Sequence, residues 1–444
     1  MKVYHILLDS NAAADAYALG KILRSGDVVV TSPGKELKAR FSACVEDQLV
    51  RKKDSSAEVE ALGEFFKALP GENLGSGALQ QYYAEVDTTV SRIISLLDEG
   101  MSLTFRDNSL IEYLDAFLVV LCAKCFAATL AAGSPEGSAL TPAVVDGRSL
   151  IVCENSGGVP VIDWTLTGKN LKAISADGIT VVAGAYGRKV QGETVALGKR
   201  GSELTANIIG SVAGASAVAF LVRSFTYEGA SGVTYEEAAQ IFSSGKPLYP
   251  RAMLPARKAG VPIELCSLEK GGEKVLTISA ESSETKENGI TGVVCSDPMT
   301  LFTVYGTGLL GNIGISSAIF GALARSGVNV HFISQASAEY SVSFAVRRKM
   351  ASKAEEALRT LIADTYQAQY NDLSYSLKEV GIVSVFGYRM RNVPGISGKV
   401  YSVIGQAGIN VIAASQGGEE MSISIVVDEK DAPATVACLS KLKL

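Results

Sequence analysis

The alternation of apolar and polar residues repeats itself in the last third of the chain. The segments SGVNVHFISQASAEYSVSFAV (326–346) and AGINVIAASQGGEEMSISIVV (407–427) are two copies of one pattern, and 81 residues separate their corresponding positions. With its flanks, each copy predicts a strand, a glycine-containing loop, a helix, a glycine turn, an apolar strand, a polar loop and an alternating strand. Self-similarity at a fixed period with only two visible copies indicates paired modules, not a solenoid.

Residues 1–285 show a different pattern, in which short apolar strands alternate with helical stretches. This order is typical of an α/β domain built around a mostly parallel sheet. DVVVTSPG (27–34) and GITVVAGAYG (178–187) predict buried strands that end in turns, and ELTANIIGSVAGA (203–215) predicts the helix that follows the second of them. A strand, a glycine loop and a helix in this order form the layout that proteins use to hold phosphate groups.

The composition narrows the class of protein. A chain of 444 residues is long enough for two or three domains, and 47% hydrophobic with 20% charged residues is typical of a soluble globular protein. The net charge of −5 offers no basic surface for nucleic acid. No apolar run reaches the length of a membrane span, and the most apolar stretch (113–132) contains Asp115 and Lys124, so we expect a buried core helix there.

Two further features of the composition bear on location and metals. The first residues read as the start of a strand and lack the layout of a signal peptide, so we expect a cytoplasmic protein. Seven scattered cysteines and only two histidines predict reduced core thiols and no metal site.

The order of elements in the repeat resembles that of the ACT domain, a βαββαβ unit that binds free amino acids. The resemblance is carried by GTGLLGNIGISSAIFGALARSGVNVHFISQASAEYSVSFAV (306–346) and VSVFGYRMRNVPGISGKVYSVIGQAGINVIAASQGGEEMSISIVV (383–427). It is strongest to the regulatory pair of aspartate kinases, especially the type fused to homoserine dehydrogenase. It implies two ferredoxin-like ACT domains, at 296–370 and 378–444.

This resemblance also implies an effector site in each copy. Each glycine loop precedes a helix, so that free backbone N–H groups can meet a ligand carboxylate, and a glutamine follows a buried strand, where its amide can both donate and accept. The alternative is that the glycines only make turns and the glutamines only solvate a loop. The effector expected from the family is threonine or lysine, and paired sheet edges favour a homodimer or higher oligomer. The candidate effector-binding residues are Gly306, Gly314, Gln335, Gly387 and Gln416.

The N-terminal region also resembles aspartate kinases. VVAGAYGRKVQGETVALGKRGSELTANIIG (181–210) is similar to the stretch in which a strand ends in Val-x-Gly-Phe-x-Gly and a later loop reads Gly-Arg-Gly-Gly-Ser-Asp. Further similarity lies in TSPGKELK (31–38), in IEYLDA (111–116) and in 233–265. The resemblance implies an amino-acid-kinase domain over 1–285, with the carbamate-kinase-like three-layer α/β sandwich.

In that family the chemistry is phosphoryl transfer from ATP, with Mg²⁺, to the β-carboxylate of L-aspartate, the first step of lysine, threonine and methionine biosynthesis. The resemblance gives catalytic roles to Lys199 and Glu112. It places aspartate-binding groups at Ser10, Arg148, Ser202 and Glu203. It places the nucleotide against Gly184, Gly187, Gly198 and Gly201.

The chain departs from the family where phosphate should be held. The family's Lys-Phe-Gly-Gly-Thr-Ser is replaced by His5-Ile6-Leu7-Leu8-Asp9-Ser10, which exchanges a lysine for a mostly neutral histidine and two glycines for bulky leucines. RSFTYEGASG (223–232) lacks the paired aspartates and the Asp-Pro-Arg of the family's nucleotide loop. Lys199 replaces an arginine, which keeps the charge but loses the bidentate fork.

Three functions therefore stay open. The chain is an aspartate kinase with a divergent nucleotide site, in which Lys35, Arg188 and Lys199 replace the missing cations. Alternatively it is a catalytically degenerate paralogue that senses amino acids as a regulatory subunit and needs no ATP. The third is an amino-acid-kinase fold directed to another substrate. For Ser202, Glu203 and Glu112 the scaffold alternative is a helix cap, a first-turn acid and a helix-surface acid.

Overall fold

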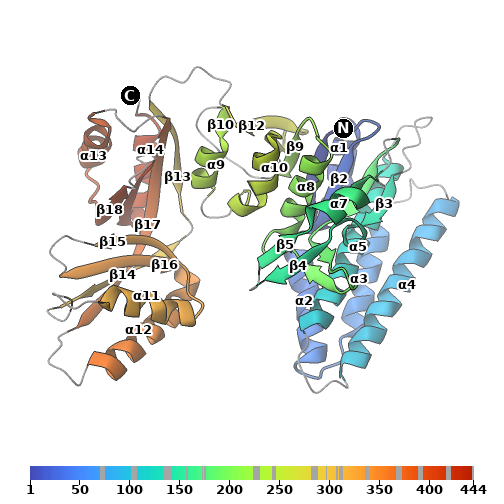
Figure 1. Ribbon diagram of the computed structural model, residues 1–444, viewed down its shortest axis with the longest axis horizontal. Helices are drawn as coiled ribbons and strands as arrows, with labels where there is room; N and C mark the ends of the chain where they lie inside the picture. The colour runs from blue at the N-terminus through green and yellow to red at the C-terminus, as the bar shows by residue number, and fades with distance from the viewer. Residues whose placement is uncertain are drawn as a thin grey trace. The chain divides into compact units, whose positions relative to one another are not determined.

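The computed structural model separates the chain into two compact units (Figure 1). Unit 1 comprises Met1–Thr226 and Ser231–Ser283, and unit 2 comprises Tyr227–Ala230 and Glu284–Leu444. The structure describes residues 1–70, 76–101, 108–133, 142–156, 159–172, 174, 177–223, 231–242, 247–281, 289–296, 298–306, 309, 314–335, 340–366, 373–388, 394–416 and 422–442.

Unit 1 is built on an eight-stranded sheet. The strands, in spatial order, are β10 (Gly232–Thr234), β12 (Glu273–Ser279), β11 (Ile263–Ser267), β9 (Val218–Val222), β1 (Val3–Leu8), β2 (Val28–Pro33), β6 (Thr180–Ala183) and β3 (Ala143–Asp146). Neighbouring strands are parallel except for β11 and β12. The central strands are apolar on both faces, as expected for a parallel sheet covered on both sides.

Helices cover both faces of this sheet, so the unit has three layers. Tyr4, Ile6 and Leu8 of β1 join a core formed with the first group of helices, whereas His5, which alternates with them, faces α8 on the other side. Figure 1 shows α4 and α5 side by side in the first group. The first group is α1 (Ala12–Gly20), α2 (Lys35–Leu49), α3 (Ser56–Ala68), α4 (Ser76–Met101) and α5 (Asn108–Ala132). The second is α7 (Trp164–Leu171), α8 (Gly201–Val212) and α10 (Leu254–Ala259).

Shorter elements complete unit 1 around this sandwich. They are α6 (Gly147–Leu150), β4 (Cys153–Ser156), β5 (Val159–Ile162), β7 (Tyr186–Arg188), β8 (Thr194–Ala196), α9 (Tyr235–Ile241) and the 3₁₀ turn η1 (Pro250–Met253). The pairs β4–β5 and β7–β8 form two small antiparallel ribbons.

Helix α5 contains the most apolar stretch of the chain. By length and composition Ser109–Ala132 is sufficient to cross a membrane, contrary to the expectation that no stretch reached that length. In unit 1, however, 67% of its most apolar window is buried, and the helix packs against β2, β6, α1 and α4. Its two charges have partners, because Lys124 pairs with Glu85 at 2.9 Å and Asp115 accepts from the Tyr186 hydroxyl at 3.0 Å. The helix serves as a core element of unit 1.

Unit 2 is an α/β unit with one seven-stranded sheet. Its strands are β13 (Gly289–Cys295), β14 (Met299–Tyr305), β15 (Val330–Gln335), β16 (Ser341–Arg347), β17 (Ser374–Tyr388), β18 (Ala413–Gln416) and β19 (Ser422–Asp428). Its helices are α11 (Ile315–Arg325), α12 (Ala351–Tyr366), α13 (Ile396–Gln406) and α14 (Ala432–Leu439), with 3₁₀ turns η3 (Arg348–Met350) and η4 (Glu429–Asp431).

The internal repeat is visible in this unit at the level of single atoms. The hydroxyls of Thr303 and Ser343 lie 3.1 Å apart in the first copy, and those of Ser384 and Ser424 lie 2.9 Å apart at the corresponding positions of the second. Helices α11 and α13 both begin after a glycine in the left-handed region, with φ of 95° at Gly314 and 89° at Gly395. A side chain with a Cβ rarely adopts this conformation, which explains glycine at both sites.

The two copies are interleaved along the chain. The 15-residue strand β17 belongs to both, since its first half pairs with β14 and its second half with β19. The outer strand of the second copy is β13, which precedes the first copy in the sequence and pairs with the second half of β17. The ranges 296–370 and 378–444 therefore each omit a strand of the copy they were meant to contain. The repeated segments do not include β13 or the first half of β17, so sequence similarity could not assign these strands to a copy.

The two copies also share a core on the sheet face opposite their helices. Met299 and Leu301 from the first copy are buried together with Ile382 and Val426 from the second. Strands β15 and β18 lie beside each other, and the Ser334 hydroxyl donates to the Ala414 carbonyl at 3.3 Å. Unit 2 is thus one folded body with two related halves.

Removal of β13 should destabilise unit 2. A fragment that begins at Ser296 leaves the edge of β17 unpaired and exposes the face of α14 that contacts β13, whereas a fragment that begins at Glu284 keeps both contacts. We expect the shorter fragment to unfold with a free energy lower by about 2 kcal/mol or more. Urea denaturation followed by circular dichroism measures this, and equal stability of the two fragments would contradict the interleaved topology.

Candidate active site

The candidate site lies at the carboxyl edge of the parallel strands in unit 1. Strands β1, β2 and β6 run in the same direction, so their carboxyl ends meet at one edge of the sheet. Gly34 follows β2 and begins α2, Gly184 follows β6, and the first turn of α8 reaches the same edge. Ligands of open α/β sheets bind at this edge.

His5 occupies the centre of this arrangement as a buried, uncharged group. Its side chain is 4% exposed, and its Nε2 lies 2.9 Å from the Ser202 hydroxyl in the first turn of α8. The Ser32 hydroxyl donates to the Ser202 oxygen at 3.0 Å, and the His5 tautomer decides whether Nε2 accepts from Ser202 or donates to it. Burial, with a smaller effect of Arg200, lowers the pKa of His5 to about 3. The imidazole is therefore neutral at cellular pH.

The residues after His5 close the end of β1 against the next strand. Leu8 is buried, and its carbonyl accepts from the Gly34 N–H at 2.7 Å. A Cβ at Gly34 would lie 2.9 Å from the same carbonyl, so this glycine is needed for the contact between the two chain segments. Ser10 is exposed beyond this contact.

A cation at this edge, Arg223, is paired with carboxylates of the protein. Arg223 follows β9 and forms an ion pair with Asp9 (3.5 Å) and a shorter one with Asp15 of α1. Burial raises the pKa of Asp15 against the opposing effect of this arginine. The remaining loop that replaces the family's nucleotide loop (224–230) lies outside the described residues.

The first turn of α8 contains a buried carboxyl. Glu203 is 2% exposed, one of its oxygens lies 2.7 Å from the guanidinium of Arg200, and the other accepts from the Tyr249 N–H at 2.8 Å. Burial raises the pKa of Glu203 to about 7, because it outweighs the lowering by Arg200, by the Tyr249 N–H and by Lys199. Lys199 is exposed and places its ammonium 5.1 Å from the centre of the Tyr249 ring.

Glu112 and Arg148 are each held by other partners. Glu112 accepts from the Ala196 N–H at 3.0 Å. Arg148 pairs with Asp146 at 2.6 Å and lies over the rings of Tyr113 and Phe117, 5.5 and 5.7 Å from their centres. Among the residues that the structure describes, no hydrogen bond or ion pair joins either side chain to His5, Ser202 or Glu203.

The glycines predicted to hold a nucleotide have partners within the protein. A Cβ at Gly184 would lie 2.7 Å from Val30 and 3.0 Å from the Ser202 Cβ; one at Gly187 would lie 2.9 Å from the Ile151 carbonyl. A Cβ at Gly201 would lie 2.8 Å from the Ala185 carbonyl, and Gly198 has a positive φ of 79°. Packing and backbone conformation therefore require these glycines without any ligand.

These observations test whether a nucleotide triphosphate with Mg²⁺ fits the site. Phosphates need cations and open backbone N–H groups. At this edge the imidazole is neutral, Arg223 is paired with carboxylates, and Gly34 and Gly184 face protein atoms. Lys199 and Lys35 are the exposed cations that flank the edge. This set does not fit a bound triphosphate, and no reaction step through ATP follows from it.

The structure places Ser202 and Glu203 in the first turn of α8, which begins at Gly201, and Arg200, not Ser202, is the residue before the helix. Sequence reasoning missed two partners at this edge. Ser32 was not singled out, although it stands at the end of a predicted buried strand. The Asp15–Arg223 pair joins residues too far apart in sequence for any local pattern to reveal it.

In unit 2 the candidate effector residues lie at equivalent places of the two copies. Gln335 and Gln416 are exposed at the ends of β15 and β18, and the Ser397 hydroxyl donates to Gln416 Oε1 at 3.3 Å. The Gly306 N–H donates to the Tyr340 carbonyl at 3.3 Å, and Gly387 lies in β17. Most of each glycine loop (307–308, 310–313 and 389–393) lies outside the described residues, so effector binding stays a prediction.

Comparisons with known proteins agree with this architecture. Residues 302–361 and 383–442 match the ACT domain family. The bifunctional aspartokinase/homoserine dehydrogenase of Haemophilus influenzae is 28% identical over 282 residues, which are 58% of this chain and 33% of that protein. The chloroplastic bifunctional aspartokinase/homoserine dehydrogenase 2 of Arabidopsis thaliana is 31% identical over 204 residues, 45% of this chain and 22% of that protein. The chain is thus similar in sequence to bifunctional aspartokinases over about half of its length.

Solved aspartokinase structures share the fold over the whole chain. Aspartokinase III of E. coli, in complex with lysine and aspartate, aligns with 99% of this chain and 98% of its own length, with a TM-score of 0.78 and 18% identity. Aspartate kinase of Clostridium acetobutylicum aligns over the same shares, with a TM-score of 0.72 and 16% identity. The chain spans a third or less of the length of the two curated relatives named above.

A substitution at Gly184 tests whether the candidate site of unit 1 is closed by packing. Gly184→Ala should lower the stability of unit 1 by about 1–3 kcal/mol, because the added methyl meets Val30 and Ser202. The control Gly168→Ala in α7, whose Cβ would have no neighbour closer than 3.8 Å, should stabilise by up to about 1 kcal/mol. Trp164, the single tryptophan, reports unfolding of unit 1 by fluorescence. An unchanged Gly184→Ala variant would show that the site is open.

Proposed function

We propose that this chain is an amino-acid-sensing regulatory protein of the aspartokinase family, and that unit 1 does not transfer phosphate from ATP to aspartate. The observation that carries the proposal is His5. A buried imidazole with a pKa of about 3, bonded to Ser202, stands where the family has a lysine.

The chemistry of phosphoryl transfer explains why this replacement matters. A polyphosphate and a carboxylate must approach each other, and only fixed positive charge makes this favourable. A neutral imidazole supplies none, and Asp9 adds a negative charge at the end of β1. Arg223 compensates Asp9 and Asp15 and is not available to a phosphate. The leucine at position 8 also fills space that a glycine would leave for backbone contact.

The proposed sensing function rests on unit 2. Each copy has a helix that begins after a left-handed glycine, with a glutamine at the end of a neighbouring strand. Backbone N–H groups at such helix starts suit the carboxylate of a free amino acid, and the glutamine amide suits its polar groups. E. coli aspartokinase III has been crystallised with lysine, which supports lysine or threonine as the effector class. We also infer a cytoplasmic protein that forms a homodimer or a higher oligomer.

A second candidate is an aspartate kinase with a rearranged nucleotide site. The observation that favours it is the first turn of α8, where Ser202, Glu203 and Lys199 keep the order of the family's substrate loop. A structure of E. coli aspartokinase III with aspartate and ADP shares the fold with a TM-score of 0.73. In this case Lys35 and Lys199 would carry the charge that His5 lacks, and L-aspartate and Mg-ATP would be the substrates.

A hydroxylamine trapping assay distinguishes the two candidates. Pure protein with Mg-ATP and L-aspartate should give no aspartyl hydroxamate above the level without aspartate, while an intact aspartokinase assayed in parallel gives product. In the same preparation, L-lysine or L-threonine should raise the melting temperature, because a ligand that binds only the folded state stabilises it. Aspartate-dependent product would overturn the proposal and establish the kinase. Absence of any shift with either amino acid would contradict the sensing function.

A further inference from the structure

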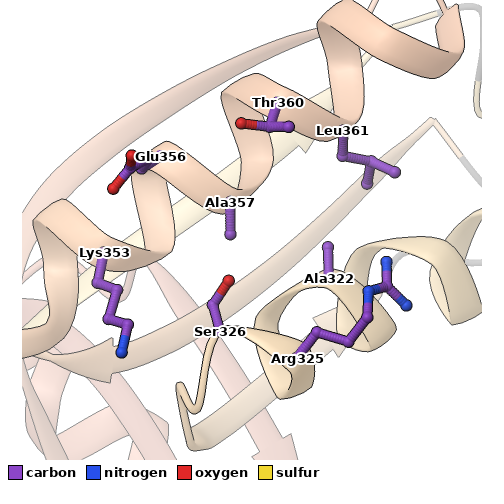
Figure 2. A pocket seen from close by; sticks show the side chains of 8 residues that line it. All are labelled: Ala322, Arg325, Ser326, Lys353, Glu356, Ala357, Thr360 and Leu361. Carbon is purple, nitrogen blue, oxygen red and sulfur yellow. The ribbon is translucent and has the colours of Figure 1, made fainter.

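The first copy in unit 2 has a groove on its outer helical layer. The residues that line it differ in charge from those at the equivalent positions of the second copy. The groove lies between α11 and α12 and has a volume of 390 Å³ (Figure 2), within the usual range for small-ligand pockets of about 300–1,000 Å³. Its lining residues are Ala322, Arg325, Ser326, Lys353, Glu356, Ala357, Thr360 and Leu361.

Three charged side chains surround this groove. Figure 2 shows Lys353 and Arg325 toward opposite ends, with Ala322, Ser326 and Ala357 between them, and Glu356 on the side of Lys353. In the described part of the chain, Arg325, Lys353 and Glu356 form no ion pair with one another or with any other group. All three side chains are exposed, so water solvates them in the free protein and a ligand of complementary charge can replace that water.

The internal repeat provides a control for what the fold itself requires. At an offset of 81 residues, the second copy has an amide and two alanines at the positions that correspond to Arg325, Lys353 and Glu356. The full set of equivalents is Val403, Gln406, Ala407, Ala434, Ala437, Cys438, Lys441 and Leu442. The second copy folds with this largely apolar set, so packing of the two helices does not demand charges in the first.

Helix stability does not explain the charges either. Lys353 lies in the first turn of α12, where the helix dipole disfavours a cation. The guanidinium of Arg325 lies back over its own helix, and a Cβ at Gly321 would stand only 3.3 Å from it. The second copy has Ser402 at the position of Gly321. Gly321 thus leaves the Arg325 side chain room to lie along the groove.

We propose that the groove between α11 and α12 is a binding site for a short dicarboxylate that also carries an ammonium group, the chemical class of the acidic amino acids. Each carboxylate meets one of the separated cations, Arg325 and Lys353. The ammonium meets Glu356, and the hydroxyls of Ser326 and Thr360 are the nearby hydrogen-bonding groups. The alanine floor accommodates the methylene groups between them. This site is separate from the glycine loops and does not rest on the effector binding proposed above.

Calorimetric titration of the full chain with three matched ligands tests the proposal. L-Glutamate has both carboxylates and the ammonium, L-glutamine lacks the second carboxylate, and glutarate lacks the ammonium. We expect saturable binding of L-glutamate, with L-glutamine weaker by about tenfold or more.

Substitutions assign the binding to the groove. Arg325→Gln and Lys353→Gln should each weaken L-glutamate binding by about tenfold, whereas Arg359→Gln, which removes one charge from the same helix outside the groove, should leave it unchanged. Glu356→Gln should weaken L-glutamate and strengthen glutarate, because the carboxylate repels an anion that lacks the ammonium. No saturable binding of L-glutamate, or binding unaffected by Arg325→Gln and Lys353→Gln, overturns the proposal. If Glu356→Gln weakens the binding of L-glutamate and of glutarate alike, the proposed contact between Glu356 and the ammonium is wrong.

Discussion

An uncharged contact between β1 and α8 determines the electrostatics of the candidate site in unit 1. The His5 imidazole, the Ser202 hydroxyl and the Ser32 hydroxyl form a buried chain of hydrogen bonds across the face of the sheet. A charged group there would lose its hydration in a site closed by packing, and a lysine would also need an anion to balance it. Because the contact is neutral, β1, β2 and α8 can close on one another without a ligand. The chain thereby has the fold of aspartokinases together with a neutral group at the centre of its candidate site.

In unit 2, too, the fold is common to both copies while the chemistry of their surface residues differs. Its two halves share β17, exchange β13 across the sequence and bury a joint core that includes Leu301 and Ile382. A ligand that ordered one half would therefore act on strands that also belong to the other. The charged groove in the first half shows that the outer surfaces of the two copies differ in chemistry.

The sequence was sufficient for features that depend on local pattern or on residue type. The repeat located the left-handed glycines Gly314 and Gly395, and the replacement of a lysine by His5 already indicated a weakened phosphate site. Contacts between distant segments were beyond its reach. The strand β13 joins β17 across roughly ninety residues, and Asp15 meets Arg223 only in the folded chain. Gly184 was expected to face a nucleotide, but a Cβ at this position would meet Val30 and Ser202. Only the packed structure shows which atoms a glycine faces.

The protonation of His5 is the most direct test of this account. The chain has two histidines, so nuclear magnetic resonance of the imidazole nitrogens gives two sets of signals, and the variant His331→Asn assigns the set of His5. We predict that His5 keeps the signals of a neutral ring from pH 8 down to about pH 4, since burial lowers its pKa to about 3. A His5 ring that becomes charged near its ordinary pKa of 6.5, or above it, would contradict the account, because the site would then hold the positive charge that phosphate requires.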